Sequence, residues 1–94
     1  MREQILGEAA ALISGDRAKD YGDAATSFSR VAFIWSGILG MDITPAQVAM
    51  CLAGLKLSRL AHTPTHEDSW VDLCGYAALG GEVAARSINE GETK

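Results

Sequence analysis

Residues 44–61 read TPAQVAMCLAGLKLSRLA, and this stretch decides the fold. Thr44 is suited to cap a helix and Pro45 to occupy its first position, so the sequence predicts a helix over 45–61. The apolar residues of this helix point in nearly every direction around its axis: Val48, Ala49, Met50, Cys51, Leu52, Ala53, Leu55, Leu57 and Leu60. A helix that is apolar all round has to be buried all round, and a chain of 94 residues has too few helices to surround it. We therefore expect an intertwined homo-oligomer, a dimer or larger.

Helical periodicity also marks the rest of the chain, and signals for strands are poor. The first helix is expected over about 2–14, where Ser14-Gly15 ends it. The second is expected over about 24–39, with a core stripe of Phe28, Val31, Ile34 or Trp35, and Ile38. The fourth is expected over about 67–88, after a short turn. The predicted fold class is all-α, a four-helix bundle protomer forming a single domain over 1–94.

The composition excludes several classes of function. Eight basic and 12 acidic side chains give a net charge of −4, which argues against direct binding of DNA or RNA. No apolar run is long enough to span a membrane, and no secretory signal precedes the first helix, so we expect a cytoplasmic protein. Cys51 and Cys74 are then expected to be small buried apolar residues, since their spacing with the two histidines matches no zinc pattern.

Four charged residues form the main candidate site. Lys56 and Arg59 share one face of the third helix, and Asp68 and Asp72 share one face of the fourth. A short turn makes these helices an antiparallel hairpin, in which residues whose numbers add to the same total lie side by side. One register, with totals of 127 and 128, therefore pairs Arg59 with Asp68 and Lys56 with Asp72. It also places Tyr76 opposite Leu52, near these pairs.

Two interpretations of these charges stay open. In the first, they are interhelical salt bridges that satisfy one another inside a bundle. In the second, they form a ligand site in which Lys56 and Arg59 bind phosphate, with arginine binding it in a bidentate manner. In that case Asp68 and Asp72 orient the cations, bind ribose hydroxyls or hold Mg²⁺.

The loop from Gly15 to Asp23 is the second candidate. It carries Arg17, Lys19 and Tyr21 between glycines, and glycine allows main-chain N–H groups to converge on an anion. Tyr21 offers a surface on which a base can stack. The alternative is a solvated charged loop.

The order of three motifs is familiar: Asp20-Tyr21-Gly22, then Lys56-x-x-Arg59, then Asp68-Ser69-x-x-Asp72-x-x-Gly75-Tyr76. It resembles a family of small tailed-phage and prophage proteins described as a domain of unknown function. That family is distantly similar to phage nucleotide-modification-associated domains, and through them to MazG-like all-α NTP pyrophosphohydrolases, which are helical oligomers that bind nucleotides with Mg²⁺.

The resemblance implies nucleotide binding more strongly than hydrolysis. MazG-like enzymes carry acidic pairs on two helices, whereas Lys56 and Arg59 here are cationic. Asp68 and Asp72 remain as a helical carboxylate pair, with Asp20 and Glu82 as auxiliary carboxylates. Two carboxylates can hold one Mg²⁺ but make a poor case for the multi-acid cluster that activates water.

The sequence therefore predicts a phage-type protein that sequesters a nucleotide or a nucleotide-derived defence signal in the bacterial host cytoplasm. This function requires no cofactor, with Mg²⁺ as an optional one, and involves no catalysis. Two alternatives remain: a Mg²⁺-dependent pyrophosphohydrolase or DNA-modification accessory, and a structural or regulatory bundle that binds protein. The predicted ligand-binding residues are Arg17, Lys19, Asp20, Tyr21, Lys56, Arg59, Asp68, Asp72 and Tyr76.

Overall fold

The computed structural model describes residues 1–14 and 24–92, with side chains through residue 86. These residues form four α-helices and no strand, which confirms the all-α fold. The helices are α1 (Arg2–Ser14), α3 (Ala24–Leu39), α4 (Pro45–His62) and α5 (Glu67–Glu92). All four begin where the sequence predicts, and α5 continues beyond its predicted end at residue 88. None of the described helices is long and apolar enough to cross a membrane.

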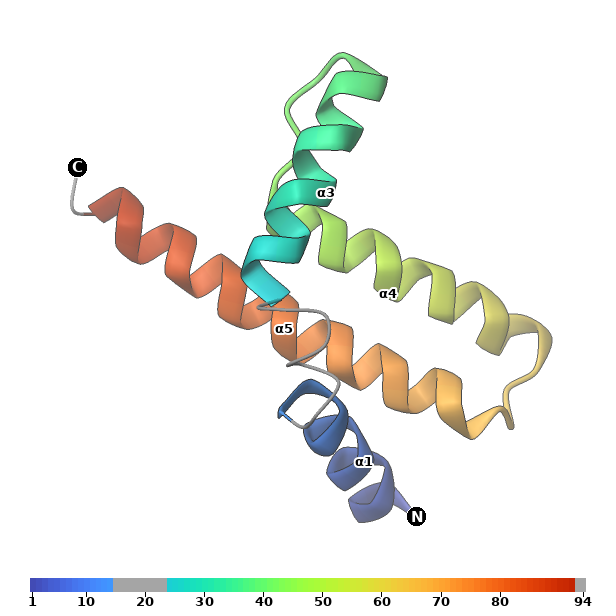
Figure 1. Ribbon diagram of the computed structural model, residues 1–94. Helices are drawn as coiled ribbons and strands as arrows, with labels where there is room; N and C mark the ends of the chain where they lie inside the picture. Colours follow the sequence, from blue (N-terminus) through green and yellow to red (C-terminus); the bar gives the residue numbers. More distant parts are fainter. Residues whose placement is uncertain (15–23, 93–94) are drawn as a thin grey trace.

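Helix α5 is the central helix of an open bundle, and the other three described helices all contact it (Figure 1). Helix α4 runs antiparallel beside the first part of α5, and the two make the most extensive contact in the molecule. Helix α1 packs against α5, whereas α3 packs mainly against α4 and only slightly against α5. The C-terminal part of α3 stands away from the α4–α5 hairpin. The four described helices therefore do not close around one common axis.

The core lies where α3 meets the hairpin. Its buried members are Phe28, Ala32, Val48, Ala49 and Val83. Helix α5 comes so close to α4 here that a Cβ built on Gly80 would lie 2.9 Å from the Cβ of Ala49. A glycine is what permits this approach, because any side chain at position 80 would meet the side-chain methyl group of Ala49.

The core stripe of α3 is only partly the predicted one. Phe28 is buried and Trp35 packs partly buried against the core, but Ile34 and Ile38 are 51% and 74% exposed. Of the two alternatives for the third position of the stripe, Trp35 is therefore correct. The prediction that Ile38 belongs to the core is wrong for the single chain. The reason is that the core covers Phe28, Ala32 and Trp35, whereas the described helices leave Ile34 and Ile38 open.

The prediction of two buried cysteines is wrong for Cys51, which is exposed, while Cys74 is half-buried. Both are free thiols. Cys51 lies on the side of α4 that faces away from α5. Met50 and Leu57 on that side are 64% and 54% exposed, so one chain alone does not bury α4 all round.

The start of α4 is fixed by local hydrogen bonds. Thr44 accepts from the backbone N–H of Gln47, and the Gln47 side chain accepts from the backbone N–H of Thr44, which is a complete capping box. Just before it, Ser36 Oγ accepts from the backbone N–H of Ile43 at 2.8 Å and ties the connection to α3. Gly40 supplies the positive φ of 67° that this turn requires.

Candidate functional site

The centre of the candidate site is an ion pair across the hairpin. Lys56 Nζ on α4 lies 3.0 Å from Asp72 Oδ2 on α5, which confirms this predicted pair. The side chains are 12% and 32% exposed, so the lysine is largely withdrawn from water and the carboxylate less so. A lysine so covered requires a compensating charge, and Asp72 supplies it.

The turn that sets this register is held by side chains. Trp70 Nε1 donates to the backbone carbonyl of Pro64 at 2.8 Å. His66 Nδ1 lies 2.7 Å from Ser69 Oγ, and Ser69 is almost fully buried. These bonds join the turn to the first turn of α5, so the two helices enter the hairpin in one fixed relation. Sequence reasoning missed this role of Trp70 and His66, because both bonds depend on the path of the turn.

The second predicted pair does not form. Arg59 and Asp68 are both exposed, and no ion pair joins them in the described part of the chain. They lie one turn nearer the loop than Lys56 and Asp72, where long polar side chains can remain in water at little cost. The row of four charges is therefore divided into a covered pair and two open groups.

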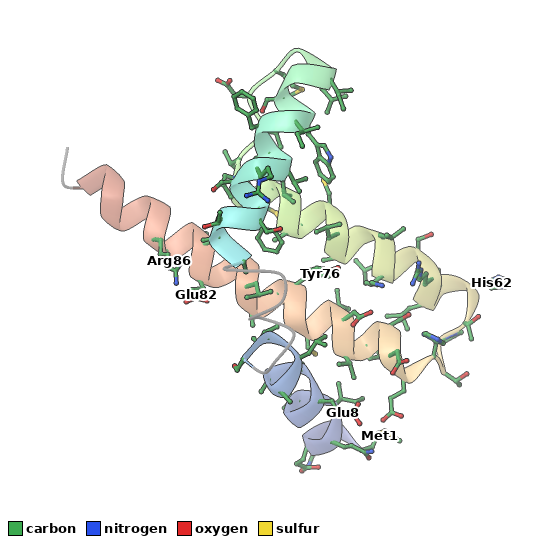
Figure 2. All side chains as sticks on the ribbon, in the orientation of Figure 1. Met1, Glu8, His62, Tyr76, Glu82 and Arg86 are labelled. Carbon is green, nitrogen blue, oxygen red and sulfur yellow. The ribbon has the colours of Figure 1, made fainter. Side chains whose placement is uncertain are left out.

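Tyr76 lies farther from the hairpin turn than the ion pair does, one turn of α5 beyond Asp72 (Figure 2). It is half-buried and packs against the same core cluster as Leu52, as the predicted register requires. Its ring is thus engaged by protein on at least one side. Glu82, further along α5, pairs with Arg86 at 2.9 Å, and Figure 2 shows the two adjacent on one side of the helix.

The carboxylates do not gather into a metal site among the described residues, where no three His, Cys, Asp or Glu side chains come together. One oxygen of Asp72 is already engaged by the Lys56 ammonium group. Asp68 stands exposed one helical turn away. Coordination of Mg²⁺ by these two residues remains a hypothesis.

The loop residues Arg17, Lys19, Asp20 and Tyr21 lie outside the described residues. Their part in a ligand site stays a prediction from the sequence.

The fold places this protein among all-α proteins with an open helical bundle. Its α4–α5 hairpin carries a covered ion pair beside an exposed arginine. The chain belongs to the family described as "Domain of unknown function (DUF6378)", whose model matches residues 4–84. Together with the two phage relatives described next, this match confirms the predicted resemblance to a phage family of unknown function.

Two phage proteins are similar to this chain. The "Gene 55 protein" of Mycobacterium phage L5 is 40% identical over 76 residues, which cover 80% of this chain and 49% of that protein. The "Gene 55 protein" of Mycobacterium phage D29 is 36% identical over 94 residues, covering all of this chain and 62% of the relative. The chain thus spans about half to three fifths of the length of these relatives. No solved structure matches it.

Proposed function

We propose that this protein binds a phosphate-bearing nucleotide, without altering it, at the turn end of the α4–α5 hairpin in the bacterial host cytoplasm. The observation that carries the proposal is the exposed guanidinium of Arg59, one turn from the Lys56–Asp72 pair and joined to no carboxylate in the described part of the chain. An arginine has five N–H donors in a planar fork that matches two phosphate oxygens. Its exposure leaves this fork accessible to a ligand.

Each of the other hairpin charges has a definite part in the proposed site. Asp72 holds the Lys56 ammonium group, so the pair adds little net charge and fixes the α4 backbone one turn from Arg59. Asp68 is available to accept hydrogen bonds from ribose hydroxyls. The cations of the 15–23 loop would add further phosphate contacts.

The choice of a nucleotide among phosphate-bearing ligands rests on the distant resemblance to nucleotide-modification-associated and MazG-like proteins. The absence of catalysis rests on chemistry. Water activation by Mg²⁺ in those enzymes uses acidic residues on two helices, and the α4 positions are here Lys56 and Arg59. Arg59 also has a simpler role, since a cation in the last turn of α4 favours the helix dipole.

A melting screen against a panel of nucleotides, with and without Mg²⁺, tests the proposal. A nucleotide present at about 100 times its dissociation constant should stabilise the folded chain by about 2.7 kcal/mol. Arg59→Ala should remove this shift. The matched control Arg30→Ala, which removes an exposed arginine from α3, should keep it.

Chromatography of the ligand after denaturation separates binding from hydrolysis. Recovery of the intact nucleotide supports sequestration, and recovery of a pyrophosphate-cleaved product supports the enzyme. If no nucleotide raises the melting temperature, or if Arg59→Ala and Arg30→Ala behave alike, the proposed site is wrong.

The protein-binding bundle is favoured by one specific observation, the exposure of large apolar side chains on α3 and α4. It predicts that Arg59→Ala has no effect on either nucleotides or partners.

A further inference from the structure

One side of α4 is exposed, free of charge and mainly apolar. This side, which we call the outer face, faces away from α5. Met50, Gly54, Leu57 and Ala61 follow it at intervals of four, three and four residues, so they form one stripe. The full outer face is exposed throughout and consists of Gln47, Met50, Cys51, Gly54, Leu57, Ser58 and Ala61.

The chain by itself buries less surface than its size predicts. Its accessible surface is 6651 Å². A compact monomer of its mass, 9.9 kDa, would expose about 5,200 Å². The excess, about 1,450 Å², exceeds the roughly 800 Å² that each partner buries in a standard interface. The radius of gyration also shows that the chain is less compact than a typical domain: it is 14.3 Å, against about 12 Å for a compact domain of this length. The open surface of the whole chain, of which the outer face is one part, is therefore larger than the area one partner buries in a stable dimer.

A second copy of the chain is the occupant that suits this face best. In a two-fold dimer each surface meets itself, so any charge at its centre would face a like charge. The outer face carries none, although the chain as a whole has a net charge of −4. A partner of opposite charge would find nothing here to pair with.

The order of side-chain sizes points to an antiparallel arrangement. If two α4 helices cross antiparallel at Gly54, Met50 lies opposite the partner's Ser58, and Leu57 lies opposite the partner's Cys51. Each large side chain then meets a small one, which is how helix surfaces interdigitate. Gly54 at the crossing point allows the two backbones to approach closely. A parallel pair would instead place each large residue against its own copy.

We propose that the protein is a symmetric dimer in which the outer faces of two α4 helices pack antiparallel around Gly54. This dimer does not depend on the proposed nucleotide site.

Gly54→Arg tests the dimer without disturbing the protomer, because a Cβ at this position meets nothing within 4 Å in its own chain. Arginine also favours a helix more than glycine does. Gly81→Arg is the matched control, since this glycine of α5 is equally open. By analytical ultracentrifugation, we expect a wild-type dimer, a dimeric control, and at least a 100-fold weaker association for Gly54→Arg. Circular dichroism should show all three to be helical.

Cysteine crosslinking tests the orientation in a Cys51→Ser background. Under oxidising conditions Gly54→Cys should give a covalent dimer, because the two copies of this position meet at the axis. Ser58→Cys should not, because it faces the partner's Met50. Crosslinking at both positions would indicate a parallel pair and overturn the arrangement. A monomeric wild-type chain, or a Gly54→Arg variant that associates as well as the control, would overturn the dimer itself.

Discussion

Both sides of α4 carry large apolar side chains, but the two sides have opposite surroundings. On the side facing α3 and α5, Val48 and Ala49 are fully or almost fully buried, and even Lys56 is mostly covered. On the outer face, Met50 and Leu57 remain more than half exposed. The hydropathy of a side chain therefore indicates that it is favoured by burial. Whether the same chain buries that side chain depends on how the protomer packs.

The largest expected difference between the two sides is in the energy of truncation. Val48→Ala removes two methyl groups from a site with no exposure and should lower the free energy of unfolding by about 2 kcal/mol. Met50→Ala should change it by less than about 0.5 kcal/mol when the chain is dilute and monomeric. Urea titration of both variants measures the two costs.

Protein concentration then separates the two faces. If a second copy covers the outer face, the cost of Met50→Ala grows as the concentration rises, while the cost of Val48→Ala stays the same. Equal costs for the two variants in the dilute, monomeric chain would show that the exposure of Met50 is wrong.

A smaller effect is expected from the charge on the covered side. Lys56→Met leaves Asp72 without its partner, and because this carboxylate keeps some contact with water we expect a loss of about 1–2 kcal/mol. The double variant Lys56→Met/Asp72→Leu should recover most of this loss, since a buried pair can be replaced by apolar side chains. Arg2→Met, which removes a largely exposed pair with Glu3, is the control and should cost almost nothing. The single variant Asp72→Leu completes a double-mutant cycle. If the effects of Lys56→Met and Asp72→Leu simply add in the double variant, the two residues do not interact in solution.

These contrasts show what the sequence could and could not predict. The start of α4 follows from local signals, because Thr44 and Pro45 act within one turn of the chain. The Lys56–Asp72 pair follows from the shortness of the turn, which leaves few registers for the hairpin. Arg59 and Asp68 add to nearly the same total, but no ion pair joins them in the described part of the chain. Register brings two side chains near each other, but an exposed pair gains little stability from forming.

The failures have a different cause. Ile34 and Trp35 lie on adjacent stripes of α3, and a periodicity in sequence does not distinguish the stripe that its own chain covers from the one that it leaves open. The bond from Trp70 to the Pro64 carbonyl depends on the path of the turn, which no pattern of residue types encodes. The predicted oligomer and the proposed dimer rest on the same observation, which is that one chain leaves apolar side chains of α4 exposed. The ultracentrifugation experiment tests both.

The smallest predicted effects distinguish two neighbouring glycines of α5. Gly80 faces the covered side of α4, where a new Cβ would lie 2.9 Å from that of Ala49, and Gly81 faces open space. Gly81→Ala should stabilise the chain by about 0.5–1 kcal/mol, because alanine favours a helix. Gly80→Ala gains the same propensity but forces the helices apart, at a cost of about 1–3 kcal/mol, so its net effect should be a loss of about 1 kcal/mol. Thermal unfolding of the two variants side by side gives the comparison. If both variants stabilise equally, α4 and α5 are not in close contact at Ala49, and the distinction between the two sides of α4 fails at its tightest point.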